Sequence, residues 1–147
     1  MSGNLDYLNR VYLRIDLDKI CNNIKEVINK VGKDTKVMAV VKADAYGHGA
    51  IEVSKALSEI GTYGFAVATV GEALALRRAG ITKPILILDF VFPNQFETII
   101  RNDIMLTVFR YEIAKELNEA AEQMGTTAHI HIKVDTGMGR IGFIPDD

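Results

Sequence analysis

Short apolar runs rich in β-branched residues alternate with helix-type apolar periodicity along this chain, and no other feature constrains the fold as much. Five such runs predict strands, within residues 35–41, 64–69, 84–89, 104–108 and 128–135. The segments before and between them predict helices, over residues 17–31, 50–61, 70–80, 94–102 and 111–124. A repeat of roughly 20 to 25 residues per strand and helix is typical of a parallel sheet with helical crossovers.

Residues 11–17 (VYLRIDL) alternate well enough to predict a further strand that leads into the first helix. The alternation by itself does not separate a doubly wound sheet from a (β/α) barrel. A complete barrel has eight strands. We therefore expect an α/β fold, a partial (β/α)8 TIM-type barrel, with about the first five parallel strands, their alternating helices and one leading strand.

Composition narrows the class of protein. The chain has 147 residues, 48% of them hydrophobic, and a formal net charge of −2. Because lysine and arginine do not cluster, neither nucleic acid nor an anionic membrane is an expected partner. The single cysteine, Cys21, cannot form an internal disulfide, and the apolar runs are shorter than the roughly 20 residues of a membrane span. We expect a cytoplasmic domain with no signal peptide.

The stretch Lys36 to Ala50, KVMAVVKADAYGHGA, places Lys42 at the end of the first buried run. In parallel α/β folds the active-site residues collect at the carboxyl ends of the strands. A lysine amine there can form a Schiff base with a carbonyl compound. The loop that follows contains Tyr46, whose hydroxyl can bind an anion, and glycines that let the backbone approach a ligand. Alternatively, the lysine extends from the strand end into water, and position alone leaves both readings open.

Residues 133–142, KVDTGMGRIG, follow the last buried run and should lie on the same rim. The glycines match G-x-G-x-x-G, but that dinucleotide-binding pattern must open a helix, and Pro145 and the remaining residues leave no room for one. We predict instead a tight turn that directs Arg140 inward, where its guanidinium can pair with a carboxylate or phenolate oxygen. Lys133 lies inside the strand pattern, where a lysine needs a partner such as Asp135. A solvent-facing position on an edge strand is the alternative.

The histidines carry weaker signals. His48 can either position the backbone of the loop or titrate. His129 and His131 share one face of the last strand, and two histidines can bind a metal ion, but no third ligand lies nearby. We therefore predict no metal site.

Two of these segments together resemble alanine racemase, the family of pyridoxal-phosphate enzymes with a barrel domain and a C-terminal β domain. AVVKADAYGHG is similar to the family's cofactor-lysine signature, and KVDTGMGRIG to its second characteristic segment. Further similar segments, in the family's order and spacing, are IDLDKICNNI, AVATVGEALALRRAGI, PILIL and LTVF. The resemblance covers nearly all of the chain but well under half of a family member. Residues 1–147 are thus expected to be the N-terminal portion of the barrel domain, without the later strands and the C-terminal domain.

The resemblance implies a pyridoxal 5'-phosphate enzyme, an isomerase that interconverts L-alanine and D-alanine and supplies D-alanine for peptidoglycan. Lys42 would bind the cofactor covalently and act as one of two bases at the substrate α-carbon. Tyr46 would hydrogen-bond the cofactor phosphate, and Arg140 would face the cofactor's phenolic oxygen and the substrate carboxylate. Val40 and Leu88 would line the cofactor ring.

The resemblance also gives Lys133 a role. It matches a lysine that is often carbamylated in this family, where the new carboxylate orients the arginine. Carbamylation would remove the positive charge of Lys133 and turn it into a partner for Arg140.

The chain departs from the family in what it does not contain. The opposite base in the family is a tyrosine from the C-terminal domain of the other subunit of a homodimer. We therefore expect the intact protein to racemise alanine and this chain alone to be inactive or nearly so. Open barrel edges should also favour self-association of the chain.

Other functions stay open. One is a pyridoxal-phosphate-binding barrel protein without racemase activity, and another is a racemase of serine or of broader specificity. A third is a structural fragment that folds only by association. A lysine-based aldolase shares the barrel lysine but lacks the loop that follows it here.

Overall fold

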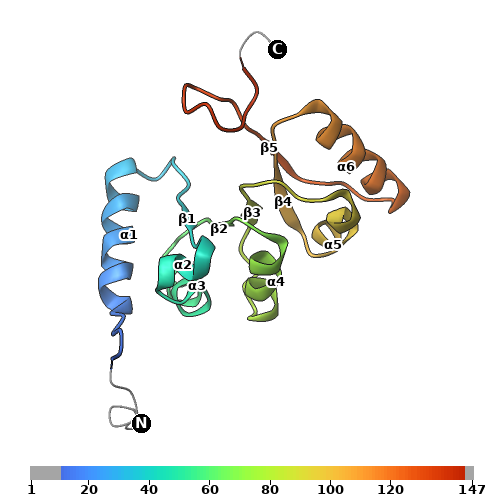
Figure 1. Cartoon of the computed structure of the whole chain (residues 1–147). Helices are drawn as coiled ribbons and strands as arrows, with labels where there is room; N and C mark the ends of the chain where they lie inside the picture. Colours follow the sequence, from blue (N-terminus) through green and yellow to red (C-terminus); the bar gives the residue numbers. More distant parts are fainter. Residues whose placement is uncertain (1–10, 145–147) are drawn as a thin grey trace.

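The computed structural model describes residues 11–144 of the chain. Its centre is one five-stranded sheet in which the strands lie in chain order and each pairs with its neighbour in parallel (Figure 1). The strands are β1 (Met38–Val40), β2 (Gly64–Val67), β3 (Ile85–Ile87), β4 (Ile104–Val108) and β5 (Ile130–Ile132). All five carboxyl ends therefore lie along one rim of the sheet.

Helices alternate with these strands, which confirms the predicted α/β fold. They are α1 (Leu17–Val31), α2 (Lys42–Gly47), α3 (Ala50–Ser58), α4 (Val70–Arg78), the 3-10 helix η1 (Pro93–Gln95), α5 (Phe96–Arg101) and α6 (Tyr111–Gln123). Figure 1 shows α3 to α6 in an arc on one side of the strands, as in the outer ring of a partial barrel. Within residues 11–144, no helix has both the length and the apolar character needed to cross a membrane.

The core lies between the strands and the arc of helices. Every second strand residue faces the helices because side chains alternate across a strand. Those of β2 and β3, namely Phe65, Val67, Ile85 and Ile87, are fully buried. They belong to one hydrophobic cluster with the helix residues Leu57, Leu76, Ile99 and Leu117. The helix face of the sheet therefore supplies the packing, and the strand ends stay free to carry a site.

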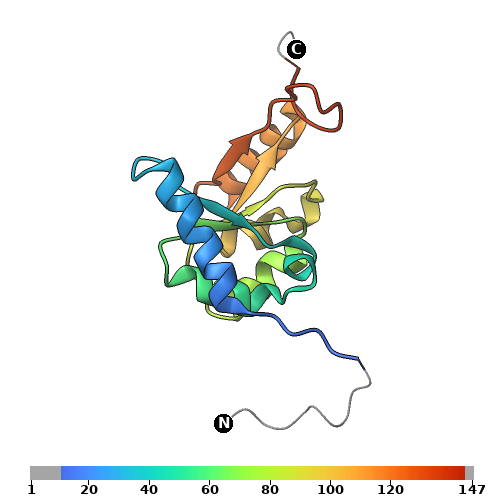
Figure 2. The same cartoon turned by 90° about the vertical axis from the view of Figure 1, so that its left-hand side faces the viewer.

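Helix α1 lies at the β1 edge of the sheet, as the turned view of Figure 2 shows. The side chain of Asp16 caps its first turn by accepting a hydrogen bond from the Lys19 amide at 3.1 Å. None of its residues is fully buried, but Ile20 and Ile24 pack against the core. The amphipathic pattern predicted this helix with its observed bounds.

The predicted leading strand is wrong. Residues 11–16 form neither strand nor helix, and the side chains of Val11, Tyr12 and Leu13 are 87%, 68% and 75% exposed. An alternating sequence forms a strand only beside a partner for its backbone, and in residues 11–144 no other strand pairs with this segment.

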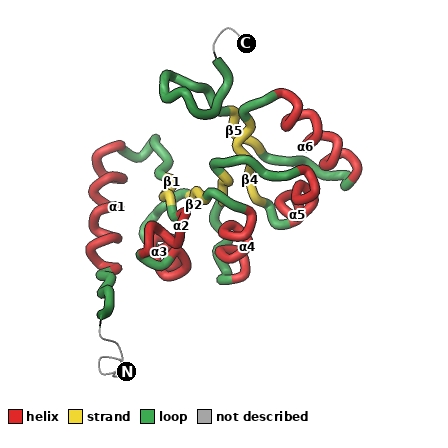
Figure 3. The backbone as a smooth tube through the Cα atoms, in the orientation of Figure 1, coloured by secondary structure: helices red, strands yellow, loops and turns green. Residues whose placement is uncertain are grey.

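Several boundaries also differ from prediction; the helix expected over residues 50–61, for example, ends at Ser58. The helix expected over residues 94–102 begins as the 3-10 turn η1, with Pro93 at its first position, before α5. The last strand pairs with β4 only over β5, and the chain beyond it runs as a long loop (green in Figure 3) to residue 144, with one isolated bridge between Val134 and Phe143.

Candidate active site

A cavity of about 160 Å³ lies at the carboxyl ends of the strands. Its walls are Lys42, Ala68, Leu88, Asp89, Lys133, Arg140 and Ile141. Lys42 comes after β1, Ala68 after β2, Leu88 and Asp89 after β3, and Lys133 after β5, so four strand ends contribute. The parallel sheet thus brings together four residues that the sequence singled out: Lys42, Leu88, Lys133 and Arg140.

The backbone after Lys42 makes a left-handed helical turn. Ala43, Asp44, Ala45 and Tyr46 all have φ between 50° and 55° and ψ between 38° and 50°. For residues with a Cβ atom this conformation costs roughly 1–2 kcal/mol each, and it seldom occurs in consecutive residues. Strain of this kind persists only where the surroundings hold it, and it gathers at functional sites.

Local hydrogen bonds hold this turn from its far end. The Asp44 carboxylate accepts from the Ala50 amide at 2.7 Å, and the Asp44 carbonyl accepts from the Gly49 amide at 3.0 Å. The His48 ring nitrogen Nδ1 lies 2.8 Å from the Ala45 carbonyl oxygen, which it can reach as a donor. His48 therefore positions the backbone, one of the two roles considered for it.

Residues 135–142 form the loop above β5, and the loop is organised by Asp135. One Asp135 oxygen accepts hydrogen bonds from the amides of Gly137 at 2.9 Å and Gly139 at 3.1 Å. These backbone donors, Gly139 first, hold the pKa of the Asp135 carboxyl below its usual range. Asp135 thus binds the loop backbone, where the sequence had suggested it as a partner for Lys133.

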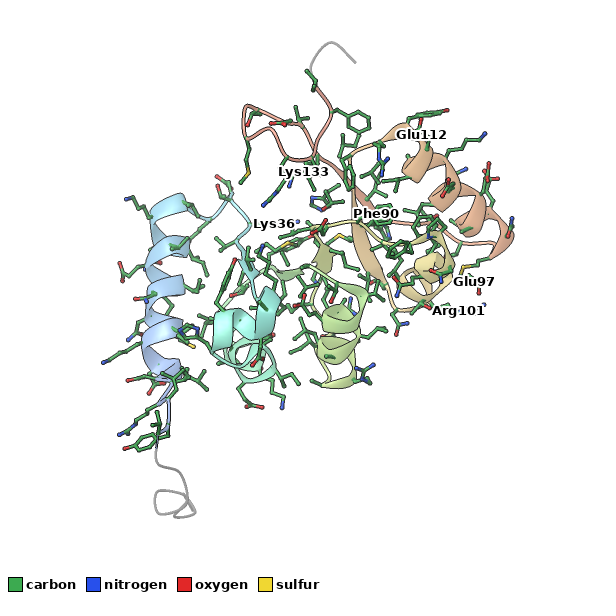
Figure 4. The ribbon with its side chains drawn as sticks, in the orientation of Figure 1. Lys36, Phe90, Glu97, Arg101, Glu112 and Lys133 are labelled. Atoms are coloured by element: carbon green, nitrogen blue, oxygen red, sulfur yellow. The ribbon has the colours of Figure 1, made fainter. Side chains whose placement is uncertain are left out.

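The loop closes by returning to the strand end. The Phe143 amide donates to the Lys133 carbonyl at 2.8 Å, and the Asp135 amide donates to the Phe143 carbonyl at 2.9 Å. Gly142, at φ 143°, lies so close to Asp135 and Val134 that a Cβ atom there would collide with their backbone. This tight crossing places Arg140 and Ile141 in the wall of the cavity, and Lys133 lies beneath the loop (Figure 4).

The cavity is electropositive. Its walls include Lys42, Lys133 and Arg140 but one carboxylate, that of Asp89, so the formal net charge of these side chains is +2. Asp89 also accepts a hydrogen bond from the Phe90 amide at 2.8 Å. Such a site favours an anionic ligand. An amine, a guanidinium and the apolar wall of Leu88 and Ala68 are the groups that pyridoxal phosphate needs at its aldehyde, its oxygens and its ring.

The cavity is smaller than the roughly 300–1,000 Å³ of a typical small-molecule site. Two predicted cofactor residues, Tyr46 and Val40, do not line it. Both line a separate apolar groove of about 410 Å³ between β1 and α1, and they are 63% and 44% exposed. The described residues thus bring Lys42, Leu88, Lys133 and Arg140 to one cavity and leave Tyr46 and Val40 in another.

The structure adds residues that sequence reasoning missed. Asp89, Ala68 and Ile141 line the cavity. Asp89 follows a buried strand as Lys42 does, so the rule that sites collect at strand ends would have found it. The strand histidines lie elsewhere: His131 is exposed, and His129 lines a cavity with Tyr63 and Asp103.

Comparison with known proteins places this chain in a family. Residues 15–147 match the family described as "Alanine racemase, N-terminal domain". The chain is 46% identical over 137 residues to an alanine racemase of Desulforamulus reducens, covering 93% of this chain and 37% of that protein. It is 51% identical over 137 residues to one of Clostridium perfringens, covering 93% and 35%. The chain thus spans just over a third of the length of these relatives.

Solved structures agree. Alanine racemase of Clostridium difficile 630 superposes with a TM-score of 0.82 at 44% identity, over 89% of this chain and 34% of that chain. The enzyme of Bacillus anthracis with bound L-Ala-P gives 0.82 at 40% identity, over 91% and 36%. With a family match over residues 15–147 and relatives about half identical over nearly all of its length, the chain belongs to the alanine racemase family.

Proposed function

We propose that the protein that contains this sequence interconverts L-alanine and D-alanine with pyridoxal 5'-phosphate, and that residues 1–147 are the N-terminal portion of its barrel domain. The observation that carries the proposal is the convergence of Lys42, Lys133 and Arg140 on one cavity at the strand ends. We further propose that the protein acts in the cytoplasm and that it supplies D-alanine for peptidoglycan.

The residues of the cavity have distinct roles in this proposal. Lys42 attaches the cofactor and moves a proton to or from the α-carbon of the substrate. Arg140 pairs with the cofactor's phenolic oxygen and with the substrate carboxylate. Leu88 contacts the cofactor ring. When bound, pyridoxal phosphate supplies the electron sink that stabilises the carbanion of racemisation.

Modification of Lys133 would reduce the excess of positive charge in this cavity. Lys133 shares the cavity with two other cations and a single carboxylate. Its neutral amine would form an N–C bond to carbon dioxide and release one proton to water, and the resulting carbamate anion would be a partner that orients Arg140. Two further residues line the groove beside β1. In this proposal Tyr46 donates a hydrogen bond to the cofactor phosphate, and Val40 makes a second contact with the cofactor ring.

We assign the second base to a residue outside this 147-residue chain. We propose that it is a tyrosine of the C-terminal domain in the other subunit of a homodimer. Removal of one base from a two-base mechanism typically costs orders of magnitude in rate. The 147-residue chain alone is therefore expected to racemise alanine negligibly.

Cofactor attachment at Lys42 tests the proposal directly. The chain is mixed with pyridoxal phosphate, freed of excess cofactor by gel filtration, and its absorbance spectrum is recorded. Borohydride reduction followed by peptide mass spectrometry then identifies the modified lysine. We expect the band of lysine-bound cofactor, with the label on Lys42, and no band in Lys42→Ala.

Lys36→Ala is the matched control. Lys36 precedes β1, its amine lies 4.5 Å from the centre of the Tyr63 ring, and it does not line the cavity. This variant should keep the band. A band of equal size in Lys42→Ala would contradict the proposal. An assay of the intact protein that contains this sequence, with L-alanine and L-serine as substrates, then separates an alanine racemase from one of broader specificity and from a barrel that only binds the cofactor.

A further inference from the structure

The carboxylate of Glu72 joins two segments of backbone at the strand ends. Its oxygen Oε1 accepts a hydrogen bond from the Ala43 amide at 2.7 Å. Its other oxygen, Oε2, accepts from the amides of Ala68 at 2.8 Å and Thr69 at 3.1 Å. One half-buried side chain on α4 thus satisfies three backbone donors from the segments that follow β1 and β2.

The position of these donors explains why an acceptor is needed there. The last backbone hydrogen bond between the two strand segments runs from the Val41 amide to the Ala66 carbonyl, at 2.8 Å. Beyond that bond the two segments separate. The amides of Ala43, Ala68 and Thr69 then need acceptors from outside the sheet. The Glu72 carboxylate supplies them at the point where the ladder stops.

Helix capping explains only part of this arrangement. Thr69 is the N-cap of α4, its hydroxyl accepts from the Glu72 amide at 3.2 Å, and the Glu72 carboxylate accepts in return from the Thr69 amide. This reciprocal pair is a capping box. A capping box contains no bond to Ala43, which lies 29 residues earlier in the chain. The bond to Ala43 therefore serves another purpose.

The two segments that Glu72 joins carry neighbouring walls of the candidate active site. Ala43 directly follows Lys42, and both Lys42 and Ala68 line the cavity. Ala43 is also the first residue of the strained left-handed turn. Hydrogen bonds within the turn hold its far end through Asp44, and the Glu72 bond holds its beginning.

We infer that Glu72 is a positioning residue for Lys42: its carboxylate ties the start of the left-handed turn to the end of β2, and so holds the Lys42 amine at the cavity. This inference rests on the proposed function for the role of the amine. The hydrogen-bonding part of it, which concerns only the backbone of this chain, can be tested without any cofactor.

The first measurement is amide hydrogen exchange. In Glu72→Gln one acceptor becomes an NH2 group that cannot accept a hydrogen bond from a backbone amide. We expect exchange at Ala43 to become about 10- to 100-fold faster, as for the loss of a hydrogen bond to a charged group. Ala45 is the internal reference, since its amide donates to the Val41 carbonyl at 2.9 Å and not to Glu72. Glu72→Asp keeps the charge but shortens the reach, so it serves if the glutamine variant does not fold.

The second measurement is the rate at which pyridoxal phosphate attaches to Lys42, followed by absorbance and by borohydride trapping. Both Glu72 variants should slow attachment about tenfold or more, because the amine is no longer held at the cavity. Thr69→Ala is the matched control. It removes the hydroxyl cap of α4 but leaves all three bonds to the Glu72 carboxylate, so attachment and Ala43 exchange should stay near those of the native chain.

The outcomes separate the two proposals. Unchanged Ala43 exchange in both Glu72 variants would overturn the inference, as would equal effects in Thr69→Ala and Glu72→Gln, which would reduce Glu72 to a helix cap. Faster Ala43 exchange with native attachment rates would likewise overturn the positioning role. If the native chain attaches no cofactor at Lys42, the proposed function fails, and exchange at Ala43 still decides whether Glu72 holds the turn.

Discussion

Lys42 and Arg140 line the same cavity although one follows the first strand of the sheet and the other lies in the loop after the fifth. The parallel sheet brings them together, because parallel strands joined by helical crossovers place all their carboxyl ends on one rim. The relationship explains why two separate sequence motifs lie at one place. The contribution of each residue can therefore be tested by substitution.

Replacement of Arg140 by lysine should weaken cofactor binding even though the positive charge is kept. A guanidinium can present two parallel donors to an oxygen pair, whereas an ammonium acts as a point charge. We expect the dissociation constant for pyridoxal phosphate to rise about tenfold, or about 1.4 kcal/mol, measured by absorbance titration. Arg78→Lys, an exposed position on α4, is the control, and an equal effect in both variants would argue against a specific role for Arg140.

Arg77 should be a principal source of stability at the opposite end of the strands. Its guanidinium donates to the carbonyl oxygens of Asn102 at 2.9 Å, Ile81 at 2.8 Å, Lys83 at 2.7 Å and Asp103 at 2.7 Å. Burial lowers the pKa of Arg77, and the Asp103 carboxylate opposes that shift. Arg77→Ala removes charged donors from four carbonyls, so we expect a loss of about 2–4 kcal/mol in the free energy of unfolding.

Urea unfolding of the Arg77 variant measures this loss. Its neighbour Arg78 is exposed, and Arg78→Ala should stay within about 0.5 kcal/mol of the native chain. A similar, small effect of both substitutions would mean that the four hydrogen bonds of Arg77 contribute little net stability.

The loop that carries Arg140 should lose stability in acid. Because backbone donors lower the pKa of Asp135 in the folded chain, the unfolded chain takes up the proton more readily. The stabilisation by Asp135 is therefore fully present above the ordinary aspartate pKa of about 3.9 and is lost as the pH falls through the lower pKa of the folded state.

A comparison with Asp135→Asn checks the sign of this effect, since an amide does not titrate. The native chain should be the more stable at pH 7, and the difference in free energy of unfolding should shrink as the pH is lowered below about 4. A difference that stays constant from neutral to acid pH would show that the charge of Asp135 does not contribute. Carboxyl chemical shifts followed by NMR would give the pKa of Asp135 directly.

Self-association of the chain should follow from its open strands. Among residues 11–144, β1 and β5 each pair with one neighbour only, and Ile130 and Ile132 of β5 are 42% and 67% exposed. Unpaired strand edges recruit other chains. Light scattering should show dimers or larger species whose share rises with protein concentration, and Ile132→Lys should reduce it. Ile51→Lys, on the outer surface of α3, should not. A monomer at high concentration would contradict the prediction.

Much of the fold could be predicted from the sequence because its elements follow local rules. The helix over residues 17–31 and the strand over 104–108 have the bounds that their apolar spacing and flanking polar residues indicated. The lysine at the end of a buried run marked the rim of the sheet for the same reason. By contrast, residues 11–17 alternate like a strand, yet strand formation depends on a neighbour that no local pattern reveals.

Other features depend on contacts between distant segments. The left-handed turn after Lys42 contains two alanines, a tyrosine and an aspartate, none of which predicts four consecutive residues of positive φ. The carboxylate of Glu72 lies within hydrogen-bond distance of the Ala43 amide because β1 and β2 are neighbouring strands. The sequence by itself determined the alternation of elements and the residue types of the site, because periodicity and propensity are local. Only the tertiary structure decided which backbone is strained and which side chain holds it, because hydrogen bonds across strands depend on the register of the whole sheet.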